Sequence, residues 1–83
     1  MPAVLREGGF SFRIYSNDHD PPHVHAVLGA GVVVITLGSP DDAPEVREFH
    51  GVKSQDVRRA LDIACERQGL LLEAWKRIYG ERG

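Results

Sequence analysis

Residues 54–79 read SQDVRRALDIACERQGLLLEAWKRIY, with an apolar residue at nearly every third or fourth position. This spacing places those residues along one side of an α-helix. Ser54 is a suitable N-cap, and Gly80 is a suitable residue just past the C-terminus. The pattern therefore predicts a helix over residues 55–79. Six of the seven residues along this stripe are apolar, and Gln68 is the polar one; the stripe consists of Val57, Leu61, Ala64, Gln68, Leu71, Trp75 and Ile78.

The length of this helix raises a question about packing. A helix from Ser54 to Tyr79 would be about 37 Å long. A compact chain of 83 residues has a diameter of about 30 Å. We therefore expect one of two outcomes. Either the helix breaks near Gly69, because glycine costs about 1 kcal/mol relative to alanine in a helix, or its end overhangs and meets a partner.

The residues before Ser54 follow the alternating pattern of strands. Strands are predicted at residues 10–16, 23–28 and 32–37, with a fourth at 45–49. The last segment is enriched in charged residues, whereas 32–37 is rich in β-branched ones. The chain thus predicts a single α+β domain over residues 1–83, with a three- or four-stranded antiparallel sheet and the C-terminal helix packed on one face.

Strand alternation assigns each residue to one of two sheet faces. The predicted helix-covered face consists of Phe10, Phe12, Ile14, Val24, Ala26, Leu28, Val33, Ile35 and Leu37, which meet Leu61, Leu71 and Trp75. One helix cannot cover both faces, so the other face is expected to stay open. It carries Arg13, Tyr15, His23, His25, Val27, Val32, Val34 and Thr36. Exposed apolar surface usually marks a binding site, although a merely solvated, amphiphilic face is the alternative.

Residues 17–25, NDHDPPHVH, hold three of the four histidines of the chain. His23 and His25 lie two apart on a strand, so both imidazoles can reach one metal ion, and His19 or Asp18 could supply a third ligand. The cluster therefore makes zinc or another divalent metal an alternative to a protein without a cofactor. Cysteine is absent from this segment, and no fourth ligand is assigned.

Two other uses of the cluster remain open. A metal-free ribonuclease needs a base, an acid and a cation, which His23, His25, Arg13 and Tyr15 supply as candidate catalytic residues. The structural alternative is a stiff connection between strands. In that case the turn-forming residues of 17–22 bond nearby backbone, and the histidines are neutral hydrogen-bonding groups.

Composition narrows the class of protein. A formal charge of −2 disfavours a general nucleic-acid binder, although local contact with nucleic acid stays open. The longest apolar run, Val32 to Leu37, is far too short to cross a membrane. The single cysteine, Cys65, cannot form an internal disulfide, and no secretion signal is visible. A cytoplasmic location is expected.

Three segments resemble the bacterial family catalogued as domain of unknown function 4160. They are residues 1–10, MPAVLREGGF, the block from Tyr15 to His25, and the closing segment 71–75, LLEAW. Gly69 departs from the family, which more often has a charged helix former there. Members of the family are often encoded beside another small protein, so the resemblance implies a toxin–antitoxin-like pair or another two-protein complex. It assigns no catalytic residue.

We therefore expect a protein-binding module rather than an enzyme, acting on a protein partner or on a second copy of itself. The alternative is a toxin-type endoribonuclease or a metal-dependent hydrolase that uses the histidine cluster. The expected binding residues are Arg13, Tyr15, His23, His25, Val32 and Val34.

Overall fold

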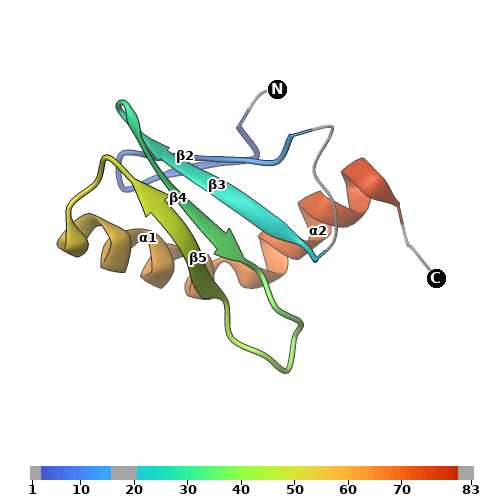
Figure 1. Cartoon of the computed structure of the whole chain (residues 1–83). Helices are drawn as coiled ribbons and strands as arrows, with labels where there is room; N and C mark the ends of the chain where they lie inside the picture. Colours follow the sequence, from blue (N-terminus) through green and yellow to red (C-terminus); the bar gives the residue numbers. More distant parts are fainter. Residues whose placement is uncertain (1–2, 16–20, 81–83) are drawn as a thin grey trace.

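The computed structural model describes residues 3–15 and 21–80. Five strands form one antiparallel sheet in the order β1-β2-β3-β4-β5, and two helices follow (Figure 1). The elements are β1 (Leu5–Glu7), β2 (Phe10–Arg13), β3 (His23–Leu28), β4 (Gly31–Thr36), β5 (Glu45–His50), α1 (Ser54–Glu66) and α2 (Gln68–Tyr79). The predicted α+β class, with an antiparallel sheet packed against C-terminal helical structure, is confirmed.

The sheet has five strands rather than three or four, because β1 was not predicted. At three residues it is too short to show an alternating pattern. Its pairing with β2 brings Glu7 opposite Phe10 across a two-residue turn. Both turn residues have positive φ, 61° at Gly8 and 85° at Gly9. Glycine adopts this conformation without strain, and turns of this kind join tightly paired strands.

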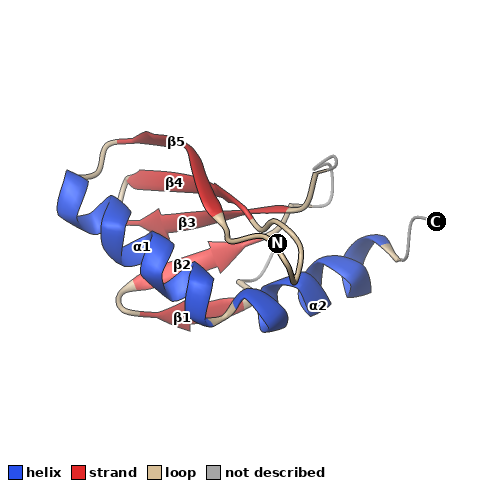
Figure 2. Ribbon diagram, turned by 90° about the horizontal axis from the view of Figure 1, so that it is seen from below, coloured by secondary structure: helices blue, strands red, loops and turns tan. Residues whose placement is uncertain are grey.

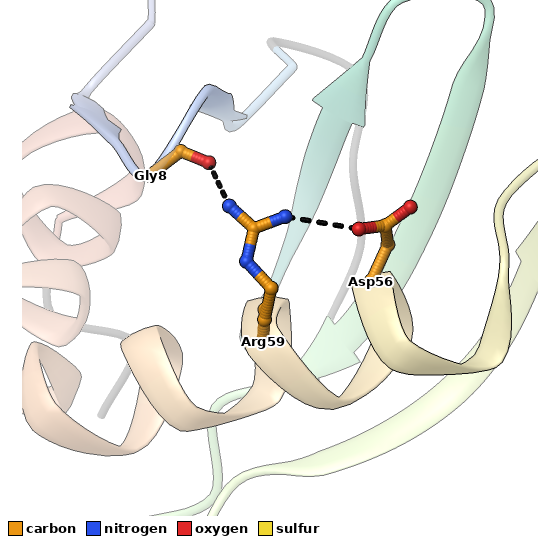
Figure 3. Close-up of polar contacts among 3 residues, drawn as sticks. All are labelled: Gly8, Asp56 and Arg59. Carbon is orange, nitrogen blue, oxygen red and sulfur yellow. Dashed lines mark hydrogen bonds and ion pairs between the residues drawn. The ribbon is translucent and has the colours of Figure 1, made fainter.

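Arg59 of α1 holds this hairpin turn against the helix (Figure 3). Its Nη2 donates to the carbonyl oxygen of Gly8 at 2.5 Å, while its Nη1 donates to Asp56 Oδ1 at 2.9 Å. The guanidinium also lies 5.3 Å from the ring centroid of Phe10. A second contact joins Arg67 Nε to Glu7 Oε1 at 2.8 Å. Arg59 of α1 and Arg67, which follows α1, therefore tie the hairpin of β1 and β2 to the helical part of the fold.

The predicted single helix is divided in two at Arg67, just before Gly69. Arg67 has φ −108° and ψ 18°, outside helical geometry. A broken helix was one of the two expected outcomes. Figure 2 shows α1 crossing the strands and α2 running past one end of the sheet. The second outcome therefore holds in part, because α2 overhangs the sheet. Among the described residues, no helix is long and apolar enough to cross a membrane.

The core lies between the sheet and the two helices. The buried strand residues are Phe10, Phe12, Ile14, Val24, Ala26, Val33, Ile35 and Leu37. The helices contribute Ala60, Ala64, Leu71, Ala74 and Trp75. Every predicted residue of the covered face is therefore in this core except Leu28, which is half-buried and packs against it. The small residues Ala60 and Ala64 let α1 approach the sheet closely.

Candidate functional site

The strand register builds the sheet face that points away from both helices. Arg13 of β2 lies opposite His25 of β3, and His25 lies opposite Val34 of β4. Residues opposite each other in an antiparallel pair project to the same face. The half-buried residues of this open face are Ser11, Arg13, His25, Val27, Val32 and Thr36. In Figure 2, α1 crosses the strands on the other side of the sheet, and α2 runs past one end of the sheet.

A row of aromatic rings connects the open face to α2. The ring of Tyr15 lies 4.7 Å from that of His25, measured between centroids, and His25 lies 5.3 Å from His23. His23 lies 5.4 Å from Trp75, which lies 4.4 Å from Tyr79. The Tyr79 hydroxyl donates a hydrogen bond to the carbonyl oxygen of Tyr15, which closes the row. These five residues form the ring row: Tyr15, His25, His23, Trp75 and Tyr79.

The expectation that His23 lies on an exposed surface is wrong. His23 is on the predicted face of the sheet, but the residue is only 6% exposed. The reason is that α2 overhangs the end of the sheet where β3 begins, so Trp75 reaches the His23 ring. The Nδ1 of His23 also donates to the carbonyl oxygen of Pro21 at 2.9 Å. His23 is therefore a packed, hydrogen-bonded residue that supports His25.

Val34 also differs from the expectation, because it is only 5% exposed. Val34 does not belong to the core cluster between the sheet and the helices. Its opposite residues are His25 on β3 and Glu48 on β5, and both have longer side chains than valine. Long polar side chains can cover a smaller apolar neighbour with their carbon atoms. The apolar surface left on the open face is thus mainly Val27 and Val32, which are half-buried.

The candidate catalytic residues are brought together in part. Arg13 and His25 are directly opposite each other, and the Tyr15 ring contacts His25. The Nε of Arg13 is buried and has no hydrogen-bond partner among the described residues. Such a donor is available to an acceptor from outside those residues. The fourth candidate, His23, lies beneath this group rather than at its surface.

Two of the four candidate metal ligands lie within the described residues. His23 and His25 have neighbouring rings, whereas His19 and Asp18 lie outside the described residues. Within residues 3–15 and 21–80, no group of three histidine, cysteine, aspartate or glutamate side chains is placed to hold an ion. Because Nδ1 of His23 is bonded to Pro21, a metal would have to bind this ring through Nε2.

Sequence reasoning missed the role of Gln68, the polar residue of the predicted apolar stripe. Its Nε2 donates to the carbonyl oxygens of Leu37 and Ser39, both at 2.8 Å, and of Asp42 at 2.6 Å. These bonds hold the loop between β4 and β5 against the start of α2. A polar residue at one position of an otherwise apolar stripe was the available signal, because such a residue needs a hydrogen-bond partner when it is buried.

Tyr79 was missed as well, since it lies outside the predicted stripe. Its ring packs against Trp75 within α2, and its hydroxyl joins the helix to the carbonyl oxygen of Tyr15, just after β2. A tyrosine near the end of an amphipathic helix gives no sequence signal for such a contact.

Comparison with known proteins gives a match to a family model. The family is described as a domain of unknown function (DUF4160), and the match covers residues 9–76. Neither a curated protein nor a solved structure matches the chain. The matched segment contains β2 to β5, α1 and most of α2, and hence four of the five residues of the ring row. The chain therefore belongs to the DUF4160 family.

Proposed function

We propose that this protein is a protein-binding module whose contact surface is the open face of the sheet. The observation that carries the proposal is the one-sided packing of the helices, which leaves Val27 and Val32 half-buried beside polar side chains. Apolar surface rimmed by polar residues is typical of protein interfaces. A partner that covers these valines would remove the remaining apolar surface of the face from water.

Polar specificity would come from Arg13, Tyr15 and His25. The three are held in place by strand pairing and by ring contacts, so they lose little conformational freedom on binding. Arginine and tyrosine are also enriched at binding hot spots. His23 and Val34, which we expected to contact the partner, would instead support this surface from within.

The partner we propose is a protein encoded beside this one, in a two-protein complex of the toxin–antitoxin kind, with a homo-oligomer as the alternative. The complex would form in the cytoplasm, without a cofactor. The support is the resemblance described above, together with an open face that one further protein layer could cover. Sheets with both faces covered are a common architecture.

The test is a change of Val32 to aspartate. Val32→Asp places a charge in the apolar part of the proposed contact, and a buried unpaired charge is strongly unfavourable. We expect loss of the complex in size-exclusion chromatography after co-expression with the neighbouring protein. Leu70→Asp is the matched control, because Leu70 is 43% exposed on α2. A complex that tolerates Val32→Asp but not Leu70→Asp would place the contact elsewhere.

A second candidate function is a toxin-type endoribonuclease. The observation in its favour is that a cation, an imidazole and a phenol lie side by side at Arg13, His25 and Tyr15. This activity predicts RNA cleavage and growth arrest on expression, both abolished by His25→Ala with the fold intact. His50→Ala is the matched control, because His50 is an exposed histidine of β5. Cleavage that survives His25→Ala would exclude this use of the site.

The metal-dependent hydrolase is a variant of the second candidate. It would require His19 or Asp18 to approach His23 and His25. Its specific prediction is stoichiometric zinc in the purified protein and a lower melting temperature after chelation. Protein that is free of metal and unaffected by a chelator would eliminate it.

A further inference from the structure

Strand β5 forms one edge of the sheet, with β4 as its neighbour on one side. Its six residues, EVREFH, are all exposed except Val46, which is half-buried. Phe49 is 50% exposed, which makes it the most exposed large apolar residue of the described chain. An edge strand presents alternate N–H and C=O groups that have no strand to bond. Such an edge is available to another strand.

The register of β5 contains an irregularity that changes which residues share a face. Glu45, Glu48 and His50 lie opposite Thr36, Val34 and Val32, so they share the open face. Val46 and Phe49 lie opposite Ile35 and Val33, so they share the helix-covered face. Arg47 falls at the irregularity between Val34 and Ile35, where it has no opposite residue in β4. Such a bulge inserts one residue and reverses the alternation beyond it.

This reversal makes β5 complementary to itself. Two copies related by a two-fold axis normal to the sheet can pair antiparallel only where opposite residues share a face. With the axis between Arg47 and Glu48, Val46 meets Phe49 of the second copy, and both lie on the helix-covered face. Glu45 meets His50 on the open face, and Arg47 meets Glu48. An unbulged strand would put each of these pairs on opposite faces.

The charges of β5 favour this register over its neighbours. It pairs all six residues and brings opposite charges together at its centre. Sliding the two copies by one residue would place Arg47 opposite Arg47, or Glu48 opposite Glu48. Like charges directly opposite each other destabilise a strand pair, whereas opposite charges stabilise it. The same charges and the bulge would deter an apolar strand from unrelated proteins.

We propose that β5 is a self-association edge, through which two copies of this chain form an antiparallel β5–β5 pair and a continuous ten-stranded sheet. The inference goes beyond the proposed function because it uses a different surface. The open faces of both copies would lie on the same side of the joined sheet and remain available to another partner. A single strand pair buries less than the roughly 1,600 Å² of a standard interface, so we expect a micromolar dissociation constant.

The test is a charge swap followed by sedimentation velocity over a dilution series. Arg47→Glu places a glutamate opposite Glu48 of the second copy, and Glu48→Arg places an arginine opposite its Arg47. Each variant alone should therefore dimerise at least about tenfold more weakly. Mixing the two variants pairs glutamates with arginines at both positions, so a heterodimer should form. The double variant, Arg47→Glu with Glu48→Arg, should again dimerise by itself.

Controls separate this surface from the open face. Arg58→Glu reverses an exposed charge on α1 and should leave the dimer unchanged. Val32→Asp tests the open face instead. If Val32→Asp abolishes the dimer but the Arg47 and Glu48 variants retain it, this inference is overturned. That result would support the open face as the contact of a homo-oligomer. Wild-type protein that stays monomeric at its highest soluble concentration also overturns it, as does a mixture of the single variants that stays monomeric.

Discussion

Val33 and Val34 are neighbours in β4 and point to opposite faces of the sheet, yet both are buried. Val33 is 0% exposed within the core formed with the helices. Val34 is 5% exposed on the side away from the helices, between His25 and Glu48. The first belongs to the core between the sheet and the helices, whereas the second lies outside it and has a polar residue opposite it on each neighbouring strand. Equal burial can therefore represent different contributions to stability.

The largest expected difference between the two faces concerns Phe12 and Ser11. Phe12 is fully buried on the covered face, and Phe12→Ala should lower the free energy of unfolding by about 3–5 kcal/mol. Ser11 is half-buried on the open face, so Ser11→Ala should change it by less than about 0.5 kcal/mol. Urea denaturation measures both. Similar losses in the two variants would mean that the open face is packed as a second core.

The same change at Val33 and Val34 sharpens the comparison. Val33→Ala should cost about 2 kcal/mol, because rigid neighbours leave a cavity where two methyl groups were removed. Val34→Ala should lower the free energy of unfolding by less than about 1 kcal/mol, since Val34 lies outside the core cluster and the exposed side chain of Glu48 can move into the space. The measurement is the urea midpoint at an unchanged m-value. Equal costs would contradict the distinction between the two kinds of burial.

The smallest expected difference is at the histidines, where α2 overhangs the end of the sheet. His23→Ala should cost about 1–2 kcal/mol, because it removes a buried ring and its bond to Pro21. His25→Ala should lower the free energy of unfolding by less than His23→Ala does. Trp75 is the only tryptophan in the chain, so its fluorescence reports its contact with His23. A spectrum that changes more with His25→Ala than with His23→Ala would contradict the ring row.

Much of the fold could be predicted from particular residues. The alternation at Phe10, Phe12 and Ile14 and the stripe through Leu71 and Trp75 correctly identified the core. A break near Gly69 was one of the two outcomes expected from helix length, and the helix breaks at Arg67. Strand β1 could not be predicted, because its three residues carry no period and gain their structure from pairing with β2.

The sequence predicted which residues would form the candidate site better than it predicted how exposed each of them is. Alternation brought Arg13, Tyr15 and His25 together, as expected. It also placed His23 on the same face of the sheet. The alternation within a strand does not show which other element packs against the end of that strand, so the burial of His23 could not be predicted. The contact between His23 and Trp75 joins residues far apart in the chain, and it depends on the path of α2 after Arg67.

The sequence by itself determined which side chains share a face, because a strand repeats every two residues and a helix every 3.6. It thereby specified the covered core and the chemistry of the open face. Only the tertiary structure decided which of those side chains meet solvent, since burial depends on neighbours contributed by other elements. It also decided the bulge at Arg47, which aligns the faces of β5 so that the strand complements itself. Such an insertion is defined by pairing with β4, and no local pattern of residues records it.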